Sequence, residues 1–417
     1  MSQFDTVASG SAVDELYDPR SEAYIQCPYD AFAATRSTAP VAHHTGIDEW
    51  FVTGRAEIED LSRDHARFAN RYSSDGTFDF TPECRAVLNR TLYYHDSLFS
   101  AESATHSRFR RLFREFFAPR NLRRIEPSIR AVAEDLVREF ADAGRTDLLR
   151  QFALPLPMTV ICDIIGIPAQ DRATVKAWHD DWIALQVTPL PAEEQLRCAR
   201  SLITYEAYVR DLLDLRHRRP AEDLLTVLAR AAAADDPVCT VDDAVVALRV
   251  MIAGGHETTT NLISNTVFHL LSERELWRKV VTNPELIDAA VEEGLRFDSP
   301  VQGAPRVTTE TVRIDGQELP KGSRLRVMFA AAGRDPNWVT NPDAFRLDRQ
   351  GSSRHLGFGH GIHFCLGAGL GRLEARTALR TLVEALPELR LKEGFAPQYA
   401  PGEFAFRGLT SLPVTWV

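Results

Sequence analysis

The sequence predicts a mainly α-helical protein with a small β region. Apolar residues recur with helical periodicity through most of the 417-residue chain. Strand-like pieces gather in only two places, about 40–60 and about 300–330. Glycine and proline are spread along the chain and do not pool in a linker, and no internal repeat is visible. We therefore expect a single domain over 1–417, whose small sheet joins the early and the late strand segments.

Helices are expected wherever the periodicity is long and regular, as over 370–389. The longest helix is central in the chain. Thr240 followed by Asp243 resembles a capping box, which predicts a helix that begins at Val241. The pattern continues to about Leu271, so this helix is expected to be about 45 Å long.

The strand segments have a different pattern. Residues 50–54 form a short apolar run, and residues 305–329 alternate between apolar and polar side chains. Asp315-Gly316 in the second segment is a turn signal, so we expect a β-hairpin there.

Composition and charge narrow the class of protein. With 44% hydrophobic and 25% charged residues, the chain has the balance of a globular protein and not of a disordered one. A net charge of −10 argues against nucleic acid as the main partner. The N-terminal segment lacks a basic start followed by an apolar core, and nowhere do 18 apolar residues run together. We expect a soluble cytoplasmic protein without a membrane partner.

The central helix contains a stretch, AGGHETTTN, that helix propensity disfavours. Two consecutive glycines cost a helix about 2 kcal/mol relative to alanines, so another interaction has to compensate for them. Gly254, Gly255 and Thr258 share one face, and Glu257 lies about 100° round the helix from Thr258. A hollow beside a hydroxyl and a carboxylate predicts a site for a small ligand. Close packing of another helix on the glycines is the alternative. His256 points away from the hollow and is given no role.

Cys365 differs from the other five cysteines. No CxxC pair or regular spacing indicates a disulfide framework, and we expect the other five to be buried or half-buried small side chains. Cys365 instead follows a glycine-rich turn and precedes a strongly periodic helix. Backbone N–H groups and the positive end of the helix dipole favour its thiolate. The pattern therefore predicts a cysteine that acts as an anion.

Three kinds of site use such a thiolate. Zinc would need His355, His360 and His363 beside the cysteine, but these residues fit no usual tetrahedral spacing. A cysteine nucleophile would need a base, and the sequence nominates none. Thiolate ligation of haem iron needs only one cysteine, whose sulfur donates electron density that favours oxygen activation.

The segment around Cys365, FGHGIHFCLG, resembles the haem-binding signature of the cytochrome P450 family, FGxGxHxCxG, at every fixed position. Four further segments resemble family motifs. HSRFR is similar to the HxxxR of a propionate-binding helix, GGHETT to the oxygen-activation motif, EGLR to the ExxR motif, and RDPNWVTNPDAFRLDR to the segment before the haem loop. Order and spacing extend the resemblance from Pro28 onward. It implies a single cytochrome P450-like fold, with haem b between the long central helix and the cysteine-bearing helix.

The resemblance assigns roles to individual residues. It implies that Cys365 is the axial ligand of the haem iron and that Glu257 and Thr258 deliver protons during oxygen activation. In the alternative interpretation, neither residue has a catalytic role: Glu257 is simply solvated and Thr258 donates to the Gly254 carbonyl. Four residues are implied to donate to the haem propionates: His106, Arg110, Arg306 and His363. His106 and Arg110 are four residues apart and therefore share a helix face. A cationic helix face that binds no ligand would have the same spacing and is the alternative.

Other positions match or depart from the family pattern. Glu293, Arg296 and Arg349 match a charged triad that is buried and serves folding. Gly333 stands before RDP, where the family commonly has Asn, and is expected to loosen a turn. AESATH stands where the family commonly has DPPEH, which changes the approach to His106.

The resemblance implies a monooxygenase that inserts one oxygen atom from O2 into a medium-sized to large organic substrate, by hydroxylation or epoxidation, in secondary metabolism. No flavin or nicotinamide fingerprint is visible, so NAD(P)H is expected to act through a ferredoxin reductase and a ferredoxin. Five arginines are expected on the cysteine side of the haem, as a docking patch for an acidic ferredoxin or as an ordinary solvated face: Arg108, Arg111, Arg114, Arg372 and Arg376.

Three other functions remain as alternatives. A haem-thiolate peroxygenase or isomerase-type enzyme usually lacks the acid–threonine pair that is present in this chain. A haem-based sensor needs no proton relay and usually carries an output module, for which 417 residues leave no room. A zinc protein without haem is the third alternative, and a visible spectrum would distinguish it.

The resemblance implies that substrate contacts come from four segments of the chain. These are 72–99, 182–191, 301–305 and the loop with Phe404 and Phe406. Their mix of aromatic and polar side chains predicts a partly oxygenated apolar molecule, such as an intermediate of secondary metabolism.

Overall fold

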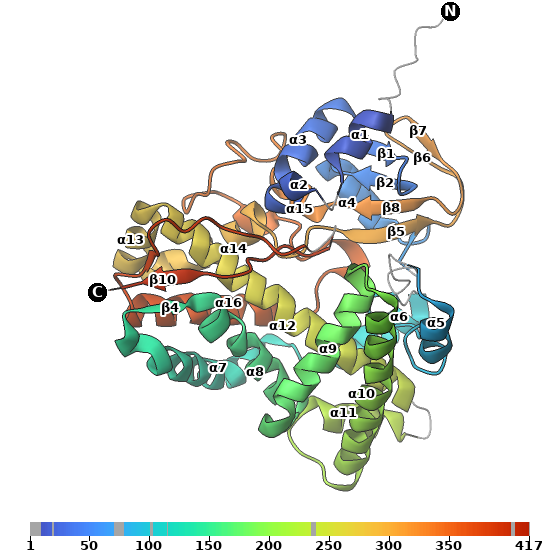
Figure 1. Cartoon of the computed structure of the whole chain (residues 1–417), viewed down its shortest axis with the longest axis horizontal. Helices are drawn as coiled ribbons and strands as arrows, with labels where there is room; N and C mark the ends of the chain where they lie inside the picture. Colours follow the sequence, from blue (N-terminus) through green and yellow to red (C-terminus); the bar gives the residue numbers. More distant parts are fainter. Residues whose placement is uncertain are drawn as a thin grey trace, which may run out of the picture. The chain divides into compact units, whose positions relative to one another are not determined.

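The computed structural model describes residues 10–18, 21–70, 79–100, 103–114, 116–234, 239–401 and 405–416. The chain forms two compact units, each built from segments that lie far apart in the sequence (Figure 1). Unit 1 comprises 1–72, 264–365 and 390–412, and unit 2 comprises 73–263, 366–389 and 413–417. Helices predominate over strands in both units, as the periodicity predicts. The expectation of one domain over 1–417 stays a prediction.

Unit 1 contains a five-stranded sheet in the order β1-β2-β8-β5-β3. Its strands are β1 (Val41–His44), β2 (Glu49–Val52), β8 (Arg324–Val327), β5 (Ala304–Thr308) and β3 (Phe68–Ala69). Strands β2 and β8 run parallel, with Trp50 opposite Leu325, and the other neighbours pair antiparallel. Early and late segments therefore meet in one sheet, as the two strand clusters predict.

The predicted hairpin also lies in unit 1. Strands β6 (Val312–Ile314) and β7 (Gln317–Leu319) pair antiparallel around Asp315 and Gly316. The φ angles of these two residues, 48° and 77°, are those of a tight two-residue hairpin turn.

Unit 1 also contains seven of the described helices. They are α1 (Gly10–Leu16), α2 (Glu22–Gln26), α3 (Pro28–Thr38), α4 (Arg55–Arg63), α13 (Arg274–Thr282), α14 (Ile287–Phe297) and α15 (Phe329–Gly333), and the unit also holds strand β9 (Arg390–Leu391). Tyr17 of the first segment stacks on Phe51 of β2, with 4.2 Å between ring centroids. The early helices and the sheet thus share one hydrophobic core.

Unit 2 holds the longer helices. They are α5 (Pro82–Leu88), α6 (Ser103–Arg114), α7 (Pro119–Phe140), α8 (Pro155–Ile165), α9 (Arg172–Val187), α10 (Ala192–Arg218), α11 (Leu224–Ala232) and α16 (Ala368–Ala385). Strands β4 (Arg145–Asp147) and β10 (Pro413–Thr415) pair antiparallel.

The central helix α12 (Val241–Ser272) begins where the capping box predicts. The backbone N–H of Thr240 donates to Asp243 Oδ2 at 2.8 Å, and the N–H of Asp243 donates to Thr240 Oγ1 at 3.1 Å. Both donors lie at the helix start, where no carbonyl of the same helix is available, so this exchange fixes the first residue of α12.

The predicted charged triad is present and buried in unit 1. Arg296 donates from Nε and Nη2 to the two oxygens of Glu293, each at 2.7 Å, and Arg349 Nε donates to Glu293 Oε1 at 3.1 Å. Arg296 Nη1 also donates to the Gly333 carbonyl at 2.9 Å. A Cβ at position 333 would lie 2.3 Å from the Arg296 carbonyl oxygen, so this glycine permits close packing and does not loosen a turn as expected.

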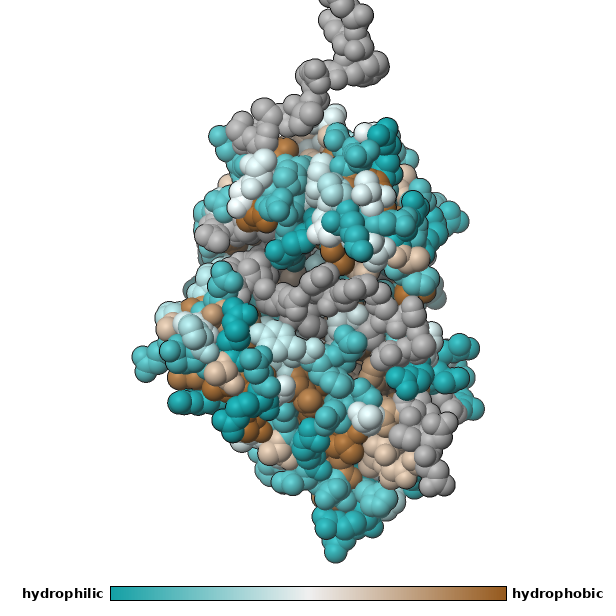
Figure 2. All heavy atoms as spheres, turned by 90° about the vertical axis from the view of Figure 1, so that its right-hand side faces the viewer, coloured by the Kyte–Doolittle hydropathy of each residue, from teal (hydrophilic) through white to brown (hydrophobic). Residues whose placement is uncertain are grey.

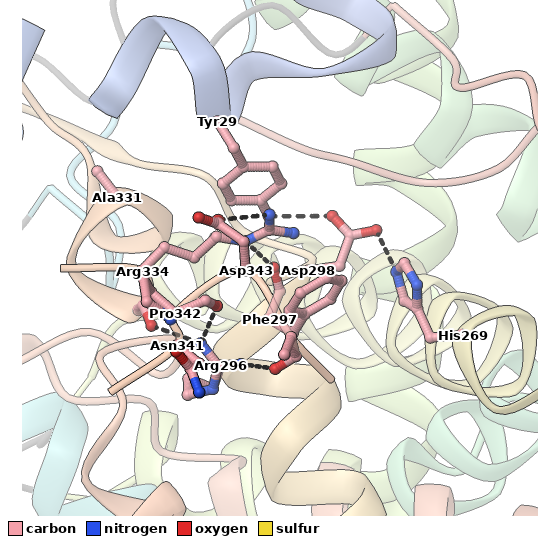
Figure 3. A network of polar contacts seen from close by, with 12 residues as sticks. Tyr29, His269, Arg296, Phe297, Asp298, Ala331, Arg334, Asn341, Pro342 and Asp343 are labelled. Carbon is pink, nitrogen blue, oxygen red and sulfur yellow. Dashed lines mark hydrogen bonds and ion pairs between the residues drawn. The ribbon is translucent and has the colours of Figure 1, made fainter. Parts of the chain in front are cut away.

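A second buried network surrounds Asp298, which directly follows α14 (Figure 3). Its Oδ1 accepts from Tyr29 Oη at 3.0 Å and from Arg407 Nε at 2.6 Å, while Oδ2 contacts His269 Nε2 at 2.9 Å and accepts from Tyr399 Oη at 3.1 Å. Burial alone would raise the pKa of Asp298. Arg407 and His269 outweigh burial and hold that pKa well below its usual range.

The surface is mostly hydrophilic on the face that Figure 2 shows, where hydrophobic residues occur in small separate groups. Among the described helices, none combines the length and the apolar character that crossing a membrane requires.

Candidate active site

The loop before α16 holds Cys365 in unit 1. Gly359 and Gly361 take φ angles of 73° and 72°, the left-handed region that glycine adopts without strain. The loop then returns on itself, and the backbone N–H of Cys365 donates to the Phe358 carbonyl at 2.8 Å. The glycines of the signature therefore shape the turn that presents the cysteine.

The Cys365 thiol is exposed, whereas four other cysteines are buried. Burial raises the pKa of Cys162 and of Cys198 to about 12, so these thiols stay protonated at neutral pH. Cys27 is also exposed, which corrects the expectation that all five remaining cysteines are at least half-buried. It lies between α2 and α3, outside any glycine-rich loop.

The histidines near Cys365 do not form a zinc site. His355 contacts Glu292 Oε2 through Nε2 at 3.3 Å, and its Nδ1 accepts from the Gly357 N–H at 3.0 Å. Both ring nitrogens are thus used for local structure. Within the described ranges, no three His, Cys, Asp or Glu side chains gather in a way that could hold a metal ion.

Two of the predicted propionate donors belong to unit 1. Arg306 lies on β5 and is buried, and its Nη1 donates to Asn70 Oδ1 at 3.0 Å and to the Pro305 carbonyl at 2.7 Å. His363 is half-buried, two residues before Cys365. Arg306 is therefore positioned by the sheet, and His363 by the loop that also holds Cys365.

The other two predicted donors lie on α6 of unit 2. His106 is buried and Arg110 is half-buried, and a spacing of four residues puts them on the same helix face. Residues 101–102, where the sequence departs from the family pattern, lie outside the described residues.

The two glycines of α12 have different neighbours in unit 2. A Cβ on Gly255 would lie 2.8 Å from Ile161 Cγ1 of α8, so this glycine permits close helix packing. A Cβ on Gly254 would meet only Phe99 Cζ, at 4.0 Å, which leaves open space beside the helix. The close-packing alternative is therefore correct for Gly255, and a hollow is present beside Gly254, whose use as a ligand site stays a prediction.

Thr258 and Glu257 have distinct environments. Thr258 Oγ1 donates to the Gly254 carbonyl at 2.6 Å, the back-bond typical of a threonine inside a helix. Glu257 is not simply solvated: although 41% of its side-chain surface is exposed, the surrounding protein desolvates the carboxylate and raises its pKa. Lys176 of α9 acts in the opposite direction. Sequence reasoning missed this neighbour, because nothing in the residues of α9 indicates which part of the chain they face.

Several expected substrate segments are also described. Phe99 and Tyr94 are large exposed aromatic residues, and Phe99 lies beside the open space at Gly254. In unit 1, Phe406 pairs with Val301 in an isolated β-bridge, which joins two of the expected segments. Positions 72–78 and Phe404 lie outside the described part of the chain.

These residues fit a haem group by their chemistry. Cys365 offers one accessible sulfur for iron, and the imidazole and guanidinium donors suit two propionate carboxylates. The open space at Gly254 lets a ligand approach the backbone of α12. Cys365, His363 and Arg306 belong to unit 1, and the remaining predicted site residues belong to unit 2.

Comparison with known proteins gives consistent matches. Residues 204–387 match the family model described as Cytochrome P450. The vitamin D(3) 25-hydroxylase of Pseudonocardia autotrophica is 34% identical, with 96% of each chain covered. The cytochrome P450 monooxygenase PikC of Streptomyces venezuelae is also 34% identical, over 93% of this chain and 91% of PikC. The crystal structure of P450BioI with an acyl carrier protein ligated to hexadec-9Z-enoic acid has a TM-score of 0.85 and 32% identity, over 95% of this chain and 100% of that one.

Proposed function

Because the chain belongs to the cytochrome P450 family and is a monooxygenase of that family, we propose that it inserts one oxygen atom from O2 into a medium-sized to large organic molecule of secondary metabolism. The exposed Cys365 thiol carries the proposal, since a glycine-rich loop presents it directly before α16. We place the reaction in the cytoplasm, with electrons from NAD(P)H through a ferredoxin reductase and a ferredoxin.

The family implies haem as cofactor, and we propose how the chain holds it. Cys365 ligates the iron through sulfur, while His106, Arg110, Arg306 and His363 donate to the two propionates. A thiolate-ligated haem iron supplies oxygen activation. The remaining task of the protein is to bind the substrate, exclude bulk water and deliver protons.

The decisive experiment determines whether the oxygen atom inserted into the product comes from O2. A compound that shifts the haem absorption band is selected from a panel and turned over with NADPH, reductase and ferredoxin under isotopically labelled O2. One labelled atom in the product supports the monooxygenase. Product that forms from hydrogen peroxide without NADPH, and at a higher rate, would favour the peroxygenase alternative instead.

We propose that Thr258 Oγ1 would position a proton donor in the open space beside Gly254. Thr258→Ala is then expected to keep haem content, substrate binding and NADPH consumption, while most reducing equivalents leave as hydrogen peroxide. The measurement is product formed per NADPH consumed. Thr259→Ala is the matched control, because Thr259 is the next residue and is buried. Unchanged coupling in Thr258→Ala would contradict the proposed role.

Glu257 is proposed to supply the protons themselves. Because desolvation raises its pKa, the protonated form persists to higher pH than in an exposed glutamate. Turnover should therefore fall as pH rises through this raised pKa. Glu257→Gln should slow oxygen turnover by about 100-fold or more and remove that pH dependence. A full rate with the wild-type pH profile in Glu257→Gln would exclude the carboxyl from the relay.

Three arginines on α6 are proposed to attract the electron donor. Arg108, Arg111 and Arg114 are all exposed, so they are available to an acidic ferredoxin. Attraction between exposed charges weakens as the Debye length falls from about 10 Å at 0.1 M salt to about 3 Å at 1 M. Ferredoxin-supported turnover should fall with added salt and in Arg111→Glu, while the substrate dissociation constant stays unchanged. Electron transfer that is insensitive to salt would contradict the docking role of this helix.

A further inference from the structure

The buried network around Asp298 includes Arg407, which belongs to residues 405–407, here called the C-terminal loop. Arg407 is buried, with 6% of its surface exposed, and each of its three guanidinium nitrogens has an acceptor. Nε donates to Asp298 Oδ1 at 2.6 Å, Nη1 to the Ile25 carbonyl at 2.9 Å and Nη2 to the Gln26 carbonyl at 2.8 Å. The guanidinium also lies 3.5 Å from the centre of the Tyr399 ring. Arg407 therefore joins the C-terminal loop to the end of α14 and to the N-terminal segment.

The backbone of the C-terminal loop is held as well. The N–H of Arg407 donates to the Pro300 carbonyl at 2.9 Å, and the N–H of Gln302 donates to the Ala405 carbonyl at 2.8 Å. The residues on both sides of Phe406 are thus fixed to the segment that follows Asp298.

Phe406 lies between these two anchored residues. It is half-buried, whereas Arg407 is buried within the network. Successive side chains of an extended segment point to opposite sides. Because the Arg407 side chain points into the network, we expect the Phe406 ring on the other side of the C-terminal loop, where it is available to a bound molecule.

The ionic character of the network indicates its role. A buried ion pair is weak evidence for stability, because taking two charges out of water offsets much of their attraction. Such a pair can instead specify one conformation, since any other arrangement leaves a buried charge without its partner. Besides Arg407, the Asp298 carboxylate accepts from two tyrosines and contacts one histidine. Arg407 keeps this counter-charge only while the C-terminal loop stays in its present place.

The Glu293 triad of the same unit serves as a comparison. It is also a buried carboxylate with arginine partners. The other acceptors of its two arginines are backbone carbonyls at positions 333, 340, 341, 342 and 344. None of these positions belongs to a segment from which substrate contacts are expected. The Asp298 network differs because its cation belongs to the loop that carries Phe406.

We propose that Asp298 and Arg407 are positioning residues, which hold the C-terminal loop so that the Phe406 ring fixes the orientation of the substrate. The inference rests on the proposed function, since the molecule oriented is the substrate of the monooxygenase. Neither residue touches that molecule. Both act from behind the loop, and the carbonyl groups of residues 25 and 26 complete the anchor.

The test weakens the anchor in the haem-loaded protein. Arg407→Lys keeps the positive charge, but one ammonium group cannot reach three acceptors that a guanidinium fork reaches together. Tyr399→Phe is the milder variant, because it removes only the hydroxyl that donates to Asp298 Oδ2. Arg216→Lys is the matched control in unit 2. Arg216 likewise donates to a buried aspartate, Asp223, at 2.5 Å, and to a backbone carbonyl at 3.3 Å.

The first measurement is hydrogen exchange at the backbone N–H groups of residues 407 and 410. The second of these donates to the Gln398 carbonyl at 2.8 Å. Exchange at both positions should be about tenfold or more faster in Arg407→Lys, the effect of losing hydrogen bonds to a charged group, and about threefold faster in Tyr399→Phe. Arg216→Lys should leave both rates within about twofold of the wild type.

The second measurement compares two ligands of haem iron, imidazole and clotrimazole. Both bind through an imidazole nitrogen, but only clotrimazole carries three aromatic rings that occupy the space of a large substrate. Dissociation constants are obtained from the shift of the haem absorption band. Clotrimazole should bind Arg407→Lys about three- to tenfold more weakly, because the Phe406 ring is no longer held in advance of binding. Imidazole should stay within about twofold in every variant.

Several results would overturn the positioning role. Unchanged exchange in both variants would show that the network does not hold the loop. Faster exchange with clotrimazole and imidazole affinities that change equally, or not at all, would leave the anchor without influence on the bound molecule. A wild-type protein that binds imidazole but not clotrimazole would mean that the loop faces no space for a large substrate.

Two safeguards keep these results separate from other failures. If Arg407→Lys does not yield folded protein, Tyr399→Phe decides the outcome by the same two measurements. The spectrum of the reduced carbon monoxide complex is recorded for every sample. A thiolate-type spectrum with a failed anchor leaves the monooxygenase proposal intact, whereas its absence in the wild type would refute the haem-thiolate site itself.

Discussion

Replacing Cys365 by serine is expected to abolish the red-shifted absorption band of the reduced carbon monoxide complex, and with it monooxygenase turnover. A serine hydroxyl is a much weaker donor to iron than a thiolate, so the electron density that favours oxygen activation is lost. The backbone of the loop should stay in place, because the N–H at position 365 still donates to the Phe358 carbonyl. The change therefore acts on the ligand and not on the fold.

A matched control is available in Cys27, whose thiol is also exposed. Cys27→Ser should keep the red-shifted band and full turnover, because this residue lies between α2 and α3 and is not part of the glycine-rich loop. Visible spectra of both variants, with haem content measured in parallel, decide the matter. Persistence of the band in Cys365→Ser would mean that another cysteine ligates the iron.

Removing Glu293 is expected to destabilise the protein by about 3 to 5 kcal/mol, a large fraction of the stability of a typical domain. Glu293→Ala leaves the guanidinium of Arg296, which is fully buried, without its counter-charge. The carbonyl groups that Arg296 also contacts carry no net charge and cannot neutralise it. Arg349 and the backbone N–H of Arg346 lose an acceptor as well.

The measurement is the denaturant midpoint of the haem-loaded protein, together with the yield of soluble material. Glu318→Ala serves as a control, since Glu318 forms an exposed ion pair with Arg313 at 3.2 Å. An exposed pair contributes about 0–1 kcal/mol, so the control should shift the midpoint little. Equal midpoints in the two variants would contradict the role of Glu293 in folding, and altered turnover at normal yield would point to a functional one.

Local patterns predicted the parts of the structure that neighbouring residues determine. The Thr240–Asp243 cap and the Asp315-Gly316 hairpin were correct because each depends on residues within a few positions. The Cys365 loop was predictable for the same reason: its glycines and its cysteine lie within one short segment.

Contacts between distant segments were not predictable in this way. Nothing around Gly255 indicates that Ile161 packs against it, and nothing around Glu257 indicates that Lys176 lies near. The network of Asp298 was missed entirely, because its four partners come from three other regions of the chain and no local spacing links them. Long-range packing decides such contacts, and a single sequence does not record them.

The Asp298 network also constrains the order in which the chain folds during synthesis. Asp298 is made 109 residues before Arg407, the cation to which it is most closely bound. Strand β4 likewise cannot pair until β10 has been synthesised. Asp147 of β4 pairs with Pro413 of β10, which is 266 residues later in the chain. Because such loops close only after the later segment has left the ribosome, neither unit can complete its native contacts early. Nascent chains should therefore stay dependent on chaperones until the last segment emerges, and a premature stop before residue 407 should yield degraded and not folded protein.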